Sequence, residues 1–232
     1  MQSVTAVART TLLRSTVRQS TRTAVTPVRY LSSSRSTLHI PRTTSRNHKM
    51  ASIVQSAAAA AHSAFATVAS ASQIKAGDSV PNVEIKVNDL EDKVNFSTLQ
   101  GKNILVLVPG AFSGTCNSQV PGYIDRYDEF KSKGVENVYI VAVNDMFVMQ
   151  AWKNKLAKDN GKETLPLLFA GDDAGKLASS LGIVFDAQAV FGGPRFMRAA
   201  LVIDSGKVVH VGVEKSPGDI TVSHADDIIS KL

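Results

Sequence analysis

Asn103-Ile-Leu-Val-Leu-Val108, followed by Pro109-Gly-Ala-Phe-Ser-Gly-Thr-Cys116 and then Asn117-Ser-Gln-Val-Pro-Gly122, is the stretch that decides the fold class. The five residues after Asn103 are apolar and are followed by Pro-Gly, which predicts a buried strand followed by a turn. Beyond Asn117, the aromatic residues Tyr123, Tyr127 and Phe130 recur at helical spacing. The stretch therefore predicts a strand–loop–helix unit with Cys116, the only cysteine, where the helix begins.

Strands and helices alternate along the rest of the chain. We expect strands at 83–88, 103–108, 137–143, 165–169, 198–203 and 207–213, and helices at 117–133, 147–158, 173–181 and 219–231. Gly134, Gly161 and Gly182 follow helical patterns, as helix-ending glycines do. Asp204-Ser-Gly-Lys207 lies between two apolar runs and predicts a hairpin turn. This order predicts an α/β fold with a central mixed sheet flanked by helices.

Basic charge is concentrated in the first 49 residues. They contain nine of the 26 basic residues and no acidic one, which leaves 17 basic against 20 acidic residues and a net charge of −3 in the remainder. A leader rich in Arg, Ser and Thr and lacking acids is typical of a mitochondrial transit peptide. Arg29, three residues before Ser32, suggests cleavage near Leu31/Ser32, whereas a disordered basic arm is the alternative. Because the basic charge belongs to the leader, we expect no nucleic-acid partner.

An Ala/Ser-rich segment, residues 50–72, separates this leader from the folded part. We interpret it as a linker and not as a membrane span or sorting segment, because alanine drives membrane insertion weakly. Met50 could also serve as an alternative start that yields a cytosolic form. Residues 73–232 are long enough for one domain with a sizeable core.

The position of Cys116 at a helix start favours its ionised form. Unpaired backbone N–H groups and the positive end of the helix dipole both stabilise a thiolate, which is the nucleophilic form of cysteine. Arg198, which leads into the apolar run of residues 199–203, is a candidate source of fixed positive charge. The plain alternatives are a buried inert thiol and a solvent-exposed arginine at a strand end.

The cysteine loop resembles the active-site motif of peroxiredoxins, in which a Pro, three residues, Thr or Ser and two residues precede the peroxidatic cysteine. Pro109, Ser113 and Cys116 fit that spacing. The start Val108-Pro-Gly-Ala-Phe112 and the later segment Val143-Asn144-Asp145 resemble the type-five, atypical subfamily. The similarity runs from about Gly77 to Leu232 and implies a thioredoxin-like fold and a homodimer.

The resemblance also implies roles for four residues. Cys116 would attack the peroxide and become a sulfenic acid, while Arg198 and the Ser113 hydroxyl would stabilise the charge that develops on the leaving oxygen. Pro109 would shape and shield the pocket, or would simply end the strand. Arg195 is expected to be solvated or engaged in other contacts.

Three departures from the family pattern affect rate and peroxide preference more than reaction type. Ser113 replaces the usual Thr, Gly114 replaces a frequent Pro, and Asn117-Ser-Gln-Val120 is one residue short and lacks a His found in many relatives. Thr115 is at the wrong spacing for a hydroxyl role. Asp145 is interpreted as the cap of helix 147–158, and Phe147 and Trp152 as core or interface residues.

The predicted function is a mitochondrial thiol peroxidase, most simply of the matrix, that reduces hydrogen peroxide and organic hydroperoxides. Since there is no second cysteine, an external thiol must reduce the sulfenic acid: glutathione with glutaredoxin, or thioredoxin. One cysteine and two scattered histidines, His210 and His224, do not make a zinc site, and we expect no cofactor. The alternatives are a redox relay that passes oxidation from Cys116 to a partner protein, and an inactive holdase.

Overall fold

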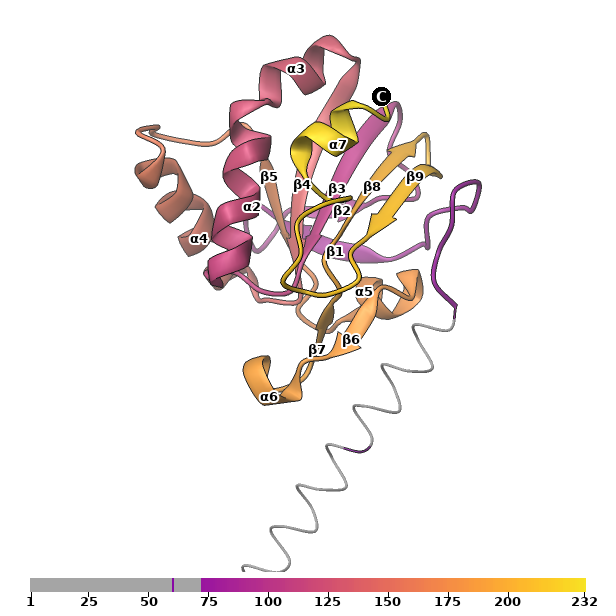
Figure 1. The fold of residues 1–232 in the computed structure, drawn as a ribbon, viewed down its shortest axis with the longest axis vertical. Helices are drawn as coiled ribbons and strands as arrows, with labels where there is room; N and C mark the ends of the chain where they lie inside the picture. The colour runs from indigo at the N-terminus through magenta and orange to yellow at the C-terminus, as the bar shows by residue number, and fades with distance from the viewer. Residues whose placement is uncertain (1–59, 61–71) are drawn as a thin grey trace, which may run out of the picture. The chain divides into compact units, whose positions relative to one another are not determined.

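Two sheets and six helices make up the part of the chain that the computed structural model describes, namely Ala60 and residues 72–232 (Figure 1). The main-sheet strands are β1 (Glu84–Val87), β2 (Lys93–Asn95), β3 (Lys102–Val108), β4 (Val135–Ala142), β5 (Leu168–Gly171), β8 (Ala199–Asp204) and β9 (Lys207–Val213). The small sheet consists of β6 (Val184–Asp186) and β7 (Pro194–Phe196). The helices are α2 (Gly114–Asp125), α3 (Tyr127–Ser132), α4 (Met146–Asp159), α5 (Lys176–Leu181), α6 (Gln188–Phe191) and α7 (Ala225–Ile229).

The main sheet is mixed, as expected. Its strand order is β2-β1-β5-β4-β3-β8-β9. β3, β4 and β5 are parallel, and the other neighbouring strands are antiparallel. The chain therefore forms the predicted thioredoxin-like α/β fold. The predicted leader, its cleavage site and nearly all of the Ala/Ser-rich segment lie outside the described residues, and in the described part no helix is long and apolar enough to cross a membrane.

Alternation of side chains along β3 divides the core between the two faces of the sheet. Ile104, Val106 and Val108 belong to the cluster that contains α2, α4 and α7 residues, whereas Leu105 and Leu107 belong to the cluster with α5 and β7 residues. Successive strand side chains point to opposite faces, so both faces are apolar where helices cover both. Figure 1 shows α2 and α7 in front of the sheet, α4 to the left of it and α5 at its lower end.

The predicted helix 117–133 is wrong in two respects. α2 begins earlier, at Gly114, and Arg126, with a ψ of 8°, separates it from α3. Pro121 removes one N–H from the helix and Gly122 lowers helix propensity. The prediction of one long helix rested on the spacing of the aromatic residues and took no account of Pro121 and Gly122.

The predicted helix 219–231 is also too long, because α7 begins at Ala225. Its first part is held as a loop by Glu214, whose Oε1 accepts from the backbone N–H of Thr221 at 2.6 Å and of Ser223 at 2.8 Å. These bonds come from a residue on another segment, so no local pattern predicts them.

Smaller differences have similar causes. α5 begins at Lys176 and not at residue 173, because the Asp172 carboxylate accepts from the N–H groups of Leu177 and Ala178 in its first turn. The strand expected at 165–169 begins at Leu168, after Pro166, which lacks a ladder donor. The short elements β2, β6, α6 and β7 were not predicted.

The predicted hairpin turn is confirmed. Ser205 and Gly206 join β8 to β9 with φ values of 47° and 75°. Two successive positive φ values are the geometry of the tight turn whose twist matches antiparallel strands. A side chain at Gly206 would also approach Ser97 O to 2.3 Å, so the position requires glycine.

Candidate active site

Cys116 lies in the first turn of α2, as its third residue, and its side chain is fully buried. Ser113, in the extended conformation, immediately precedes the helix. The N–H groups of the first turn have no partner within the helix and point toward this end. The predicted position of the thiol at a helix start is therefore confirmed, although the helix begins three residues earlier than expected.

Arg198 contacts the sulfur because of strand pairing. β8 runs antiparallel to β3, with Ala199 opposite Leu107, so the residue before β8 lies beside the end of β3, where the cysteine loop begins. Nη1 of Arg198 lies 3.5 Å from Cys116 Sγ, and the arginine is 1% exposed. A solvent-exposed arginine at a strand end, the plain alternative, is therefore wrong.

Two acceptors fix the Arg198 guanidinium. Its Nε and Nη2 donate to Pro217 O at 3.0 and 2.8 Å, and Nη1 also donates to Gln119 Oε1 at 2.6 Å. Of its five donors, four thus have partners, and one N–H of Nη2 has none among the described residues. This N–H is available to an oxygen that enters beside the sulfur.

A buried polar chain orients Gln119 in turn. Its Nε2 donates to both the carbonyl and the hydroxyl oxygen of Ser223 at 2.9 Å, and the Ser223 hydroxyl donates to Glu214 Oε1 at 2.8 Å. Tyr123 adds a 2.7 Å bond to Ser223 O. Burial raises the pKa of Glu214, but the hydrogen bonds from Thr221 and Ser223 outweigh burial and lower the pKa overall.

These supporting residues were missed in the sequence. Glu214 lies about a hundred residues from Gln119 in the chain, and only the pairing of β8 with β9 brings Glu214 to the site. One signal was present: Gln119 stands in the shortened segment that lacks the family histidine.

A cavity of about 230 Å³ opens beside Arg198. It is lined by Pro109, Ser113, Thr115, Phe185, Val190, Phe191, Arg198, Pro217 and Gly218. The predicted residues Pro109, Ser113 and Arg198 are thus brought together. Thr115, which was given no hydroxyl role, also lines the cavity. The Ser113 side chain does not cap α2, so its hydroxyl is free to face the cavity.

The loop between Pro109 and Cys116 is tied to α4 and to the segment before it. Asn144 Oδ1 accepts from Ala111 N at 3.0 Å, and Asp145 caps α4 by accepting from Val148 N at 3.0 Å, as predicted. Asn117 donates to Phe112 O and accepts from the Trp152 indole N–H at 2.7 Å. The Asn-Asp segment therefore supports the cysteine loop.

The remaining predicted side chains are placed as follows. Trp152 is buried in the core, whereas Phe147 is 66% exposed. His224 lies at the N-terminus of α7 and accepts from Asp226 N. Within residues 72–232 and Ala60, no three His, Cys, Asp or Glu side chains are grouped so that they could hold a metal ion.

Residues 75–229 match the redoxin family, which sets the class of the protein. The chain is 40% identical over 159 residues to peroxisomal membrane associated protein 20 of Schizosaccharomyces pombe, covering 68% of this chain and 99% of that protein. It is 38% identical over 135 residues to the mitochondrial peroxiredoxin-2F of Arabidopsis thaliana, covering 57% of this chain and 65% of that protein.

Among solved structures, the chain resembles reduced Prx3 of Vibrio vulnificus in complex with hydrogen peroxide, with a TM-score of 0.61 and 34% identity over 69% of this chain and 100% of that one. The chain belongs to the peroxiredoxin family. It is a peroxidase oxidoreductase, and it also resembles peroxiredoxin 5 of Alvinella pompejana, with a TM-score of 0.57 and 29% identity over 68% of this chain and 97% of that one.

Proposed function

We propose that the chain reduces hydrogen peroxide and organic hydroperoxides at Cys116 through a sulfenic acid. The observation that carries this proposal is the 3.5 Å contact between the buried Cys116 sulfur and the guanidinium of Arg198, a residue that also lines a cavity of about 230 Å³. A fixed positive charge at this distance, in a site of low dielectric, favours the thiolate over the thiol.

In the first step, the thiolate attacks one peroxide oxygen and the O–O bond breaks. The sulfur loses two electrons and becomes the sulfenic acid, while the departing oxygen takes a proton and leaves as water or an alcohol. Negative charge develops on this oxygen. The unpartnered N–H of Arg198 Nη2, the N–H groups near Thr115 and Cys116, and the Ser113 hydroxyl are the donors that stabilise it.

Pro109 and the aromatic wall complete the pocket. Pro109 is buried at the end of β3 and offers no N–H that would hold water. Phe185, Val190 and Phe191 contribute apolar side chains to the cavity lining. An apolar wall favours the organic part of a hydroperoxide, while the polar end reaches Arg198.

An external thiol completes the cycle. Because Cys116 is the only cysteine in the chain, the sulfenic acid condenses with a thiol of glutathione or thioredoxin, releasing water. A second thiol, delivered by glutaredoxin or by the second thioredoxin cysteine, reduces this mixed disulfide. Since Cys116 is fully buried, the first turn of α2 must open before such a thiol reaches the sulfur.

For location and assembly, we propose a matrix enzyme that forms homodimers. The acid-free, arginine-rich leader and the similarity to a mitochondrial peroxiredoxin support import. The exposed aromatic side chains of Phe112 and Phe147 offer apolar surface for a second copy. Sequencing the N-terminus of the protein from isolated mitochondria and measuring its mass by light scattering test these two points.

Steady-state peroxide consumption tests the function. The full chain should turn over hydrogen peroxide and tert-butyl hydroperoxide with glutathione and glutaredoxin or with a thioredoxin system. Cys116→Ser should consume none, whereas Ser118→Ala, a change on the exposed face of the same helical turn, should match the wild type. A single rapid oxidation of Cys116, without turnover by either thiol system, would favour the redox relay. Unchanged function in Cys116→Ser would favour the holdase.

A further inference from the structure

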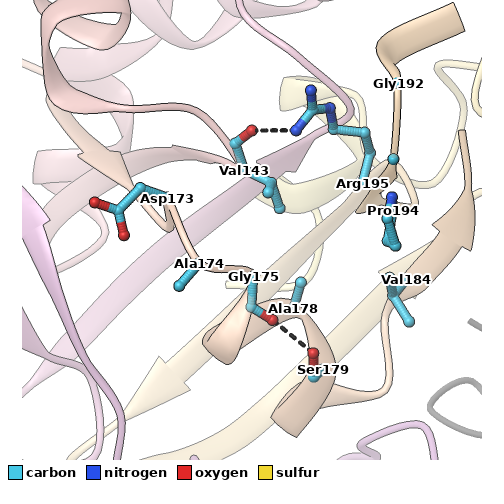
Figure 2. Close-up of a pocket in the computed structure, with 11 residues that line it drawn as sticks. Val143, Asp173, Ala174, Gly175, Ala178, Ser179, Val184, Gly192, Pro194 and Arg195 are labelled. Atoms are coloured by element: carbon cyan, nitrogen blue, oxygen red, sulfur yellow. Dashed lines mark hydrogen bonds between the residues drawn. The ribbon is translucent and has the colours of Figure 1, made fainter. Parts of the chain in front are cut away.

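Arg195 connects two segments that each contact the cysteine loop. Its Nη1 donates to Val143 O at 2.7 Å, shown as a dashed line in Figure 2, and its Nη2 donates to Phe191 O at 2.8 Å. The centre of the guanidinium also lies 5.5 Å from the centroid of the Phe191 ring. Arg195 was expected to be solvated or engaged in other contacts, and the structure shows the second of these, with specific partners.

Both segments contact the loop. Asn144, which follows Val143, accepts the hydrogen bond from Ala111 N. On the other side, the Phe191 ring packs against Gly110, where a Cβ atom would meet the ring at 2.8 Å. Phe191 also lines the cavity that Arg198 enters. Arg195 therefore connects the support of the loop with the apolar wall of the peroxide pocket.

The surroundings of Arg195 show that these contacts define its position. A second cavity of about 310 Å³, which shares no lining residue with the cavity beside Arg198, lies next to the Arg195 guanidinium (Figure 2). Nε is buried without a partner, and burial lowers the pKa of Arg195. In the described part of the chain no carboxylate pairs with it. Two carbonyls and one ring hold a charge whose burial is otherwise unfavourable.

We propose that Arg195 is a positioning residue that sets the Phe191 wall of the peroxide pocket and thereby the preference for bulky over small hydroperoxides. The proposal rests on the proposed function. Without the two carbonyl bonds, α6 and Phe191 lose their fixed place over Gly110. A bulky organic hydroperoxide then loses its apolar wall, whereas hydrogen peroxide still depends on Cys116, Arg198 and backbone donors.

The test compares kcat/KM for tert-butyl hydroperoxide and for hydrogen peroxide in the full chain. Arg195→Met fills a similar volume but has no guanidinium group to donate hydrogen bonds. Arg195→Lys retains the positive charge, but a single ammonium group cannot bind both carbonyl oxygens as the planar guanidinium does. We expect the ratio to fall about tenfold in Arg195→Met, the scale of lost apolar pocket contacts. The ratio should also fall in Arg195→Lys. It should stay unchanged in Arg126→Met, a change at an exposed arginine.

A double-mutant cycle shows whether Arg195 acts through Phe191. Phe191→Ala should lower the ratio by itself, and adding Arg195→Met should lower it little further, because coupled residues are not additive. An unchanged ratio in folded Arg195→Met, or in Arg195→Lys if the first variant does not fold, would overturn the proposal. So would independent effects in the cycle.

Hydrogen exchange separates this proposal from the peroxidase function itself. The Ala111 amide should exchange faster in the Arg195 variants than in the wild type, whether or not the chain consumes peroxide, because Val143 no longer steadies Asn144. Equal Ala111 exchange would overturn the positioning role. A wild type that fails to reduce either peroxide would instead refute the proposed function.

Discussion

Replacing Arg198 should reveal how much of the reaction depends on the charge beside the sulfur. At 3.5 Å and an effective dielectric constant of about 20, a unit charge on the guanidinium and one on the sulfur attract each other by about 5 kcal/mol, an upper limit because water can enter the vacated space. Loss of a single preorganised donor typically costs about 10²- to 10³-fold in rate. We therefore expect Arg198→Ala to slow the reaction with peroxide by about 10³-fold.

Arg198→Lys distinguishes charge from geometry. A lysine retains the positive charge, but one ammonium cannot bind Pro217 O with two donors and still reach Gln119 and the sulfur. We expect a loss of about tenfold to 10²-fold, between wild type and Arg198→Ala. Arg126→Ala is the matched control, because that arginine is exposed and pairs only with Glu129 and Asp226 in the described structure.

The assay is stopped-flow fluorescence. Trp152 is the only tryptophan, and its indole binds Asn117, the residue after the cysteine, so its emission should report oxidation of the sulfur. Circular dichroism melts check folding, because Arg198→Ala leaves buried acceptors on Gln119 and Pro217 unpaired at about 1–3 kcal/mol each. A folded Arg198→Ala that reacts within about threefold of the wild type would refute the reasoning, since no donor loss of the expected size would then be present.

Three further predictions concern the surroundings of the site. Glu214→Gln should lower the free energy of unfolding by about 1–3 kcal/mol at neutral pH. Because the pKa of Glu214 is depressed in the folded state, the stability difference between wild type and variant should shrink as the pH falls below the ordinary pKa of a glutamate. Identical denaturant curves at neutral pH would contradict this. Ser113→Val should slow peroxide reduction about tenfold by removing one hydroxyl donor, whereas Ser113→Thr should be neutral or faster; equal rates for all three in stopped flow would remove Ser113 from the mechanism. Asn117→Ala should release Trp152 and Phe112, lower stability by about 1–2 kcal/mol and speed amide exchange in the first turn of α2, and unchanged exchange would show that the turn is held by other contacts.

Local sequence patterns predicted most of the strands and helices of the fold. The apolar run ending at Val108 and the turn at Ser205-Gly206 are fixed by composition and backbone preference, so both were placed correctly. The helix after Cys116 was placed but not its break at Arg126, because one proline and one glycine alter a regular pattern without erasing it.

The residues of the site also fall into those that local sequence predicts and those that only the folded chain brings together. Pro109, Ser113 and Cys116 lie in one short segment that runs from the end of β3 into the first turn of α2, and the geometry of that segment is local. Arg198 was identified as a charge leading into an apolar strand, and strand pairing then placed it beside the sulfur. The contacts made by Gln119, Glu214 and Arg195 depend on segments that meet only in the folded chain, so no sequence pattern predicted them.

Trapping with dimedone after one equivalent of hydrogen peroxide is added to the full chain is the most direct test of the central claim, that Cys116 is the nucleophile and becomes a sulfenic acid. We expect a dimedone adduct on the Cys116 peptide, and no adduct when peroxide is left out. An adduct on another peptide only, or no adduct at all while peroxide is consumed, would contradict the account.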